Sequence, residues 1–292
     1  MLKNILPHIA LFLSNTIYAI NYIVAKDVMP HYLEPRVFVF IRVAGAAIIF
    51  SYIHFFFIKE KIQSSDIFRL VLCALLGVVI NMNCFFMGLS ITSSINASLI
   101  MITTPIIVYV LSMFFLRERS AKKAMGVILG FIGSVVLITD GGSADNMNSV
   151  IYGDILVLIN ATSYAFYLIL VKSLMSKYHP LTVLKFIFLI GFVLLCAFSF
   201  KEIQNINFSQ LPLNIFLKIG YVIFFTTCCS YFLNIYAISK VKASTVALYI
   251  YLQPLLATLI SVSLGREELL TTQIISALCI VIGVYLVIKR NA

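Results

Sequence analysis

Charged residues are scarce in this sequence: they make up 11% of its 292 residues, whereas 62% of the residues are hydrophobic. A soluble domain carries roughly 25% charged residues, because its surface has to be hydrated. The few charges also lie in clusters, and long uncharged or nearly uncharged runs separate them. This scarcity excludes an ordinary water-soluble globular protein and indicates that the chain folds in a lipid bilayer.

Metal-binding and catalytic motifs are lacking as well. All six cysteines lie inside apolar runs at spacings that fit no metal site, and we interpret them as small packing residues. The four histidines are scattered, and no HExxH pattern occurs. An intramembrane enzyme would need a carboxylate pair, a Ser–His arrangement or a metal cluster within the membrane. We therefore expect no catalytic residue, no metal and no cofactor, and an intramembrane enzyme stays a remote alternative.

The basic residues of the chain do not form the kind of basic and aromatic patch that binds nucleic acid. The net charge is +10, but the basic residues lie in short loops and form no patch with aromatic residues. Nucleic acid is therefore not expected as a partner. The expected partners are a small-molecule substrate and the lipid bilayer; a monomer is compatible with the sequence, which leaves the oligomeric state open.

Ten apolar runs approach the roughly 20 residues that a helix needs to cross the hydrocarbon core of a bilayer. Inside lipid each backbone amide has to be paired within its own segment, so these runs are predicted to be helices. The predicted fold class is an all-α integral membrane protein with ten transmembrane helices. The predicted spans are about 5–25, 36–58, 67–89, 94–116, 123–139, 152–175, 181–200, 215–238, 243–264 and 271–288.

Lysine and arginine are distributed unequally between the two sides of the predicted bundle. Fourteen of the 21 fall on one side and five on the other, while Arg42 and Lys185 fall inside spans. Cytoplasmic loops carry the positive excess in membrane proteins. The count predicts a multi-pass protein of the plasma (inner) membrane with both termini in the cytoplasm.

One part of the sequence occurs twice. Pro105 and Glu118 in "TTPIIVYVLSMFFLRE" recur as Pro254 and Glu267 in "LQPLLATLISVSLGRE", each shifted by 149 residues (254 − 105 and 267 − 118). The first and sixth spans agree at an offset of 146, where Tyr18 meets Tyr164 (164 − 18). The two copies are five spans apart, and because five is odd the second copy is predicted to be inverted in the membrane. The predicted units are a first five-helix repeat over 1–139, an external linker over 140–151 and a second five-helix repeat over 152–288.

The chain resembles the ten-helix type of the drug/metabolite transporter superfamily, which has two EamA repeats. The matching segments are "SSINASLIMITTP" and "VKASTVALYIYLQP", then "FLRERS" and "SLGREE", and the late glycines Gly133 and Gly283. The resemblance covers nearly the whole chain. It implies a secondary transporter of small metabolites, often an exporter of amino acids or related solutes. An inverted repeat is also a recurrent transporter design, in which two conformations open to opposite sides.

Polar side chains at helical spacing predict a substrate-binding cavity. Ser14, Tyr18 and Asn21 lie at i, i+4 and i+7 on one helical face. A polar stripe facing lipid would be costly, so it is expected to face the interior, although hydrogen bonding between helices would explain single residues equally well. The other predicted substrate-binding residues are Asn81, Asn83, Thr103, Thr104, Asn160, Tyr164, Tyr167, Asn234, Tyr249, Tyr251 and Gln253.

Arg42 and two prolines complete the predicted site. Arg42 lies about 9 Å into the second span, counted from Arg36 at the helical rise. It could bind an anionic group of the substrate, and it could equally extend to the interface. In the resembled superfamily an arginine is often found at this place, which is consistent with a structural role too. Pro105 and Pro254 each remove one helical hydrogen bond and are predicted hinges, with a packing kink as the alternative.

The distribution of acids bears on the kind of solute. All eleven Asp and Glu residues lie in predicted loops or within a few residues of a span end. An exchanger of protons for cationic drugs is expected to carry a carboxylate at mid-membrane depth. The sequence therefore favours a neutral, zwitterionic or amphipathic solute, and the resemblance implies export of amino acids or related metabolites. An alternative is a carrier of sugar-phosphate or nucleotide-type anions that uses Arg42.

The inverted repeat makes a testable prediction about sidedness. Single cysteines that replace Arg117 and Arg266, in a chain without its six native cysteines, are expected to react with a membrane-impermeant maleimide from opposite sides. The cysteine at 266 should be labelled in intact cells and the one at 117 only in inverted vesicles. Labelling of both from the same side would exclude the inversion.

Overall fold

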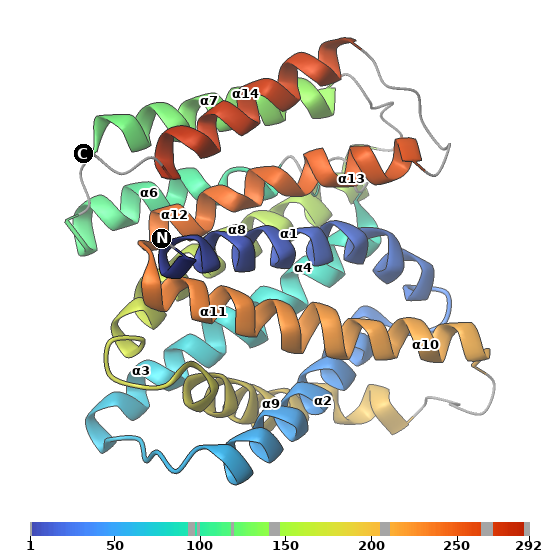
Figure 1. Cartoon of the computed structure of the whole chain (residues 1–292). Coiled ribbons are helices and arrows are strands. Elements are labelled where there is room, and N and C mark those ends of the chain that lie inside the picture. The colour runs from blue at the N-terminus through green and yellow to red at the C-terminus, as the bar shows by residue number, and fades with distance from the viewer. Residues whose placement is uncertain are drawn as a thin grey trace.

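The structure, a computed structural model, describes residues 2–92, 97, 100–117, 120–139, 147–204, 211–263 and 271–288. Within these ranges the regular elements are helices, which line up side by side as ten segments across the molecule (Figure 1). The first five segments comprise α1 (Leu2–Val28), α2 (Pro35–Phe57), α3–η1–α4 (Ser64–Ala74, Leu75–Val79, Ile80–Ile91), α6 (Thr104–Phe115) with the residues before it, and α7 (Ala121–Thr139). The second five comprise α8 (Met147–Leu174), α9 (Pro180–Gln204), α10–η3–α11 (Leu213–Tyr221, Val222–Cys229, Ser230–Lys240), α12–η4–α13 (Ala243–Leu248, Tyr249–Tyr251, Leu252–Ser263) and α14 (Thr271–Ile288).

The helical segments coincide with the predicted spans apart from their ends. Helix α8 begins at Met147, inside the segment predicted as a linker, and α9 continues to Gln204. Six segments are long and apolar enough to cross a membrane by length and composition alone: Ile5–Val28, Pro35–Phe57, Ser64–Ile91, Ile151–Leu174, Pro180–Ala197 and Leu213–Lys240. The chain is thus an all-α, multi-pass integral membrane protein.

The packing of the helices shows that the two halves are related by inversion. Helix α1 packs against α11 and α13, and its counterpart α8 packs against α4 and α6, the counterparts of α11 and α13. Helices α2 and α9 pack against each other, as do α7 and α14. Exchanging the halves therefore reproduces the same set of contacts. In Figure 1, α1 runs from left to right and α8 from right to left, so the repeats have opposite directions.

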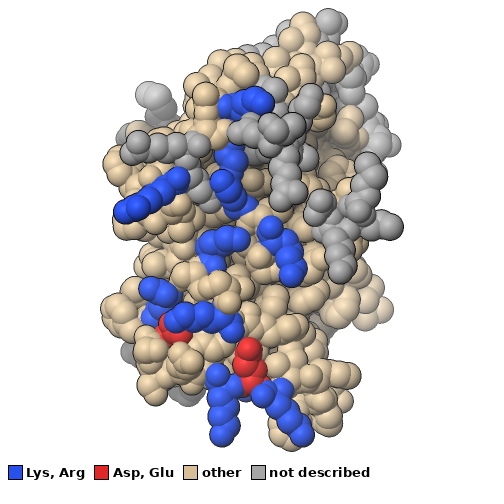
Figure 2. All heavy atoms as spheres, turned by 60° about the vertical axis from the view of Figure 1, so that its left-hand side comes forward, with Lys and Arg blue, Asp and Glu red and all other residues tan. Residues whose placement is uncertain are grey.

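One end of the bundle is rich in basic residues. The N-terminus and the connections 58–63, 175–179 and 241–242 lie at the left of Figure 1. Figure 2 brings this side forward and shows many Lys and Arg side chains but few Asp and Glu. Within the described part of the chain, basic side chains therefore gather at the end of the molecule where these connections lie. Glu118, Arg266 and Glu267 of the repeated motif lie outside the described residues.

The fourth and ninth spans are interrupted at equivalent places. In the fourth span the helix stops at the turn of Ile102 and Thr103 before α6 begins, and in the ninth a short 3₁₀ segment, η4, separates α12 from α13. Pro105 lies in the first turn of α6, and Pro254 is the third residue of α13. A proline is tolerated there because the first amides of a helix have no helical partner in any case. The prolines therefore mark where a second half-helix starts, whereas the sequence predicted hinges, with packing kinks as the alternative, within the continuous spans 94–116 and 243–264.

The third and eighth spans share a different irregularity. Both contain a π-helical stretch, η1 at Leu75–Val79 and η3 at Val222–Cys229. The repeat offset of 149 places the first stretch within the second (75 + 149 = 224 and 79 + 149 = 228). Such stretches are frequent at functional sites, because the wider turn changes which side chains face inward.

Glycines set the closest helix contacts. A Cβ atom on Gly283 of α14 would lie 2.8 Å from the carbonyl oxygen of Gly126 and 2.9 Å from the backbone nitrogen of Gly130, both in α7. A Cβ on Gly88 of α4 would lie 2.7 Å from the carbonyl oxygen of Gly153 in α8. Backbone atoms cannot move aside as a flexible side chain can, so these positions need glycine for close packing.

Replacing Gly283 by alanine is expected to destabilise the protein, because overpacking typically costs about 1–3 kcal/mol. The matched control is Gly220→Ala in α10, where a Cβ atom meets nothing within 4 Å. The control should be neutral or slightly stabilising, since alanine favours a helix over glycine. Thermal unfolding of the detergent-solubilised variants measures both, and equal melting temperatures would contradict the described contact between α7 and α14.

Candidate functional site

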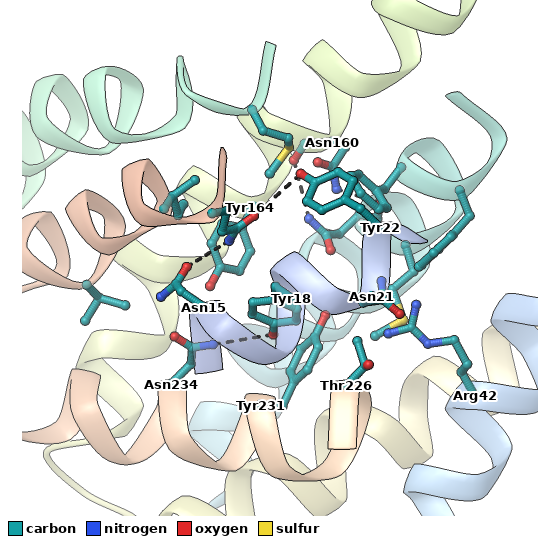
Figure 3. Close-up of a pocket in the computed structure, with 18 residues that line it drawn as sticks. Asn15, Tyr18, Asn21, Tyr22, Arg42, Asn160, Tyr164, Thr226, Tyr231 and Asn234 are labelled. Atoms are coloured by element: carbon teal, nitrogen blue, oxygen red, sulfur yellow. Dashed lines mark hydrogen bonds between the residues drawn. The ribbon is translucent and has the colours of Figure 1, made fainter. Parts of the chain in front are cut away.

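A cavity lies where the two repeats meet, with about 710 Å³ of empty space, including space that continues into solvent. Its walls come from α1, α2, α4 and the fourth span of the first repeat, and from α8, η3, α11 and the ninth span of the second. Figure 3 shows the side chains from these helices pointing toward one another around it. The lining residues are Asn15, Tyr18, Asn21, Tyr22, Arg42, Asn81, Met82, Phe85, Phe86, Met101, Asn160, Tyr164, Thr226, Tyr231, Asn234, Val246, Ile250 and Gln253.

Asparagine 234 of α11 connects the second repeat to α1. Its amide nitrogen donates to Oη of Tyr18 (3.4 Å) and to the carbonyl oxygen of Ser230 in its own helix (3.0 Å). The amide oxygen of Asn234 accepts from Oγ of Ser14 at 3.4 Å. The polar stripe predicted on α1 thus faces α11. Tyr18 lies at the cavity wall (Figure 3), whereas Ser14 bonds Asn234 outside the lining.

Gln253 makes the corresponding connection from the ninth span. Its amide nitrogen donates to the side-chain oxygen of Asn15 at 2.8 Å. Its amide oxygen accepts from Oη of Tyr22 at 3.5 Å. Gln253 is the second residue after the η4 segment. Its hydrogen bonds therefore attach the broken helix to α1 at the cavity wall.

Asn81 and Asn160 pair with each other across α4 and α8. The amide nitrogen of Asn160 donates to the backbone carbonyl of Asn81 (2.8 Å), and that of Asn81 donates to the backbone carbonyl of Asn160 (3.4 Å). The side-chain oxygen of Asn160 is buried and has no hydrogen-bond partner among the described residues. The same holds for the side-chain oxygen of Asn21. The cavity wall therefore presents two acceptors with unused hydrogen-bonding capacity.

Arg42 is the charged residue of the cavity lining, and its side chain is 2% exposed. Its Nε donates to Oγ1 of Thr227 at 3.0 Å, and its Cζ lies 4.5 Å from the ring centroid of Phe86. Its Nη1 has no hydrogen-bond partner in the described part of the chain. The guanidinium group faces the cavity beside Asn21 and Thr226 (Figure 3).

The structure brings together about half of the residues predicted from the sequence. Those that line the cavity are Tyr18, Asn21, Arg42, Asn81, Asn160, Tyr164, Asn234 and Gln253. The remaining predicted residues lie elsewhere: Ser14, Asn83, Thr103, Thr104, Tyr167, Tyr249 and Tyr251.

The side chains outside the lining have other surroundings. Asn83 donates to the carbonyl of Val79 in its own helix (2.8 Å). The hydroxyl of Thr103 donates to the carbonyl of Ile100 (2.7 Å), which also accepts from the backbone nitrogen of Thr103 (3.0 Å). The hydroxyl of Thr104 is buried, and no partner is found for it within the described ranges.

The three tyrosines outside the lining also contribute to packing. The ring of Tyr167 lies against Gly77, where a Cβ atom would come within 2.5 Å of it. Tyr249 shares a hydrogen bond of 2.9 Å with Nδ1 of His8. Oη of Tyr251 donates to the carbonyl of Val127 in α7 at 3.1 Å.

Several lining residues were missed by the sequence reading. Tyr231 donates to the carbonyl of Gly77 in η1 (3.0 Å), and Thr226 lies within η3. The positions of both therefore depend on π-helical stretches, which an apolar sequence does not predict. Asn15 adjoins the predicted stripe and was detectable as the residue next to Ser14. The apolar lining residues Met82, Phe85, Phe86, Met101, Val246 and Ile250 carry no signal that separates them from core residues.

Comparisons with known proteins agree with this architecture. The model of the EamA-like transporter family matches residues 5–139 and again residues 151–289, so the chain belongs to this family. An uncharacterized transporter of Archaeoglobus fulgidus is 28% identical over 261 residues, covering 89% of this chain and 91% of that protein. A WAT1-related protein of Arabidopsis thaliana is 25% identical over 307 residues, with 92% and 81% covered.

A solved crystal structure superimposes on the chain with a TM-score of 0.78, covering 98% of this chain and 96% of the other at 15% identity. That likeness shows the fold alone. The family match supports a transporter of small molecules in a membrane and points away from an enzyme. It thereby agrees with the drug/metabolite transporter resemblance read from the sequence.

Tyrosine substitutions test whether the cavity is the place where the solute binds. Tyr18→Ala and Tyr164→Ala remove cavity-wall rings and are expected to reduce metabolite flux into proteoliposomes by roughly tenfold, equivalent to about 1.4 kcal/mol of lost binding. Tyr251→Phe removes a hydroxyl outside the cavity, so it should lower stability by about 1 kcal/mol and leave flux unchanged. Unchanged flux in both alanine variants, with monodisperse protein, would contradict the cavity as binding site.

Proposed function

We propose that the protein exports small zwitterionic metabolites, with amino acids as the main class, by alternating access in the plasma (inner) membrane. The repeats are taken as 1–139 and 152–288, joined outside by 140–151, and both termini as cytoplasmic. Substrate would bind in the cavity between the repeats. The observation that carries the proposal is a lining of amides and tyrosines with one arginine and, among the described residues, no carboxylate.

The polar groups of the lining suit a zwitterion. Arg42 offers a positive charge to a carboxylate, and the unpartnered side-chain oxygens of Asn21 and Asn160 are acceptors for an ammonium group. Tyrosine rings attract cations as well, and Tyr18, Tyr22, Tyr164 and Tyr231 face the same space. A cationic drug would find no opposite charge on the described wall, whereas a zwitterion can satisfy both kinds of group.

The apolar part of the lining sets a second property of the solute. Met82, Phe85 and Phe86 come from one helix, α4, and Met101, Val246 and Ile250 from the fourth and ninth spans. Apolar and aromatic walls with a few placed polar groups are typical of small-molecule sites. Side chains of this kind favour an amino acid with an apolar group over a strongly hydrated sugar.

Alternating access is supported by the position of the cavity within the inverted repeat. Both repeats supply its walls, so a movement of one repeat against the other changes which side it opens to. The breaks before α6 and in the ninth span provide places where half-helices can turn, with Pro105 and Pro254 as the proposed hinges. In discontinuous membrane helices such irregular backbone is found where it lines a cavity.

A carrier for sugar phosphates or nucleotides is the alternative that the test has to separate. Such substrates carry two or more negative charges and need several buried cations. Within the described lining only Arg42 is charged. The alternative therefore predicts competition by phosphate esters, which the zwitterion proposal does not.

The proposal is tested by comparing metabolites in the medium of cells with and without overexpression, followed by counterflow in proteoliposomes. Amino acids are expected to accumulate in the medium only with overexpression, and labelled amino acids to enter liposomes that are preloaded with the unlabelled solute. Competition by phosphate esters instead would favour the anion carrier. Absence of flux over a broad panel, with folded protein, would contradict the proposal.

A further inference from the structure

The geometry points to a built anion subsite at the junction of α2 and η3. We propose that Nη1 of Arg42 and Oγ1 of Thr226 together hold the carboxylate of the solute, and that Thr227 positions the guanidinium group for this task. The inference rests on the proposed function for the identity of the solute. It adds that the carboxylate is a required group and names the residues that recognise it.

Arg42 is a buried cation without a charged partner in the structure. None of the ion pairs in the described part of the chain involves it. The guanidinium group of Arg42 lies over the rings of Phe86 and Phe38, with Cζ 4.5 and 5.8 Å from the ring centroids. The faces of these rings attract the cation. An ionised group buried without a counter-charge is costly, so a carboxylate arriving at the unpartnered Nη1 gains an unusually strong interaction.

Thr227 fixes the orientation of Arg42 through the π-helical stretch. Its hydroxyl donates to the carbonyl of Val222, five residues earlier, at 2.8 Å. The hydroxyl oxygen of Thr227 then accepts from Nε of Arg42 at 3.0 Å. Because the hydroxyl proton is committed to Val222, the lone pairs are directed to Arg42, and Nε is occupied while Nη1 stays available. Thr227 is thus a positioning residue that acts through Arg42.

Thr226 provides a second donor next to the cation. Thr226 is fully buried and belongs to the cavity lining, and its hydroxyl has no hydrogen-bond partner among the described residues. A threonine in a regular helix usually donates to a carbonyl one turn earlier. In Figure 3 the hydroxyl of Thr226 lies between Tyr231 and the guanidinium group of Arg42. One cation and one neutral donor match the two oxygens of a single carboxylate.

The number of charges distinguishes this subsite from a phosphate site. A carboxylate carries one negative charge, which Arg42 neutralises, whereas a phosphate monoester carries nearly two at neutral pH. The second charge would stay uncompensated in a low-dielectric wall. At the offset of 146, the counterpart of Arg42 in the second repeat is Phe188 (42 + 146), which is 0% exposed and apolar. The described cavity therefore has one anion subsite and not a symmetric pair.

Matched solute pairs test the requirement for a carboxylate. Each amino acid is compared with its amide, which keeps the ammonium group and the side chain but lacks the anionic charge; leucine with leucinamide and methionine with methioninamide are suitable. Wild-type protein in proteoliposomes is expected to transport the amino acid at least roughly tenfold better than the amide at low concentration. Equal transport of both members would overturn the anion subsite while leaving the proposed function intact.

Substitutions locate the recognition. Arg42→Gln and Thr226→Val should reduce the preference for the acid over the amide, whereas Thr226→Ser should retain it. Thr227→Val should weaken apparent affinity for the acid with little change for the amide, and Thr227→Ser should restore it. Thr16→Val and Thr162→Val are matched controls, because these hydroxyls donate to carbonyls of their own helices, Phe12 and Leu158, outside the cavity. An unchanged preference in Arg42→Gln and Thr226→Val would overturn the proposal.

Thermal stabilisation of the detergent-purified protein by the same pairs gives an answer that does not require flux. Stabilisation by the amino acid but not by its amide, lost in Arg42→Gln, supports the subsite even if no transport is seen. Transport failure with binding preserved would then count against the proposed function alone. Equal stabilisation by acid and amide, or none by either, would overturn the anion subsite.

Discussion

In a hydrocarbon environment a polar group has to find its partner within the protein, and this constraint explains most of the irregular features of the structure. At the helix break in the fourth span, the carbonyl of Ile100 accepts from both the backbone nitrogen and the hydroxyl of Thr103. The π-helical stretch η1 leaves the carbonyl of Gly77 available, and Tyr231 of the other repeat donates to it. Nη1 of Arg42, at the cavity wall, is one of several buried polar atoms that have no hydrogen-bond partner among the described residues, and it is the one that carries a positive charge next to a cavity.

The cavity owes its position to the inverted arrangement. Helices α1 and α8 are equivalent, because each packs against the third and fourth helical segments of the opposite repeat. Their inner faces therefore meet the same kinds of neighbour, and each carries an amide and a tyrosine at the wall. Gln253 bonds to Asn15 and Tyr22, and Asn160 and Asn81 bond to each other reciprocally, so each link joins the repeats through two hydrogen bonds. A hydrogen bond contributes only about 1 kcal/mol, so the proposed movement of the repeats can exchange these links.

Helical periodicity predicted the fold and part of the site for identifiable reasons. Ten apolar runs and the charge asymmetry are properties of long segments, so small errors at the ends did not matter. Two residues of the stripe predicted on α1, Tyr18 and Asn21, line the cavity, and their role in binding stays a prediction. Asn81 and Asn83 could not both face the cavity, since residues two apart point to opposite sides of a helix. Thr226 and Tyr231 depend on the phase change within η3, and Tyr251 on the 3₁₀ segment, which no apolar pattern discloses.

Phe188 occupies the position in the second repeat that corresponds to Arg42 in the first. The two repeats therefore share a fold but differ in charge at this position. In the proposed alternating access, a perfectly symmetric pair would give two resting states that are related by a two-fold axis in the membrane plane and have identical energies. With a single cation fixed to one repeat, the two resting states differ in the hydration and the electric potential that the guanidinium group experiences. Under the proposed alternating access, this one side chain therefore contributes to the preference between the two resting orientations, and the membrane voltage becomes a term in that contribution.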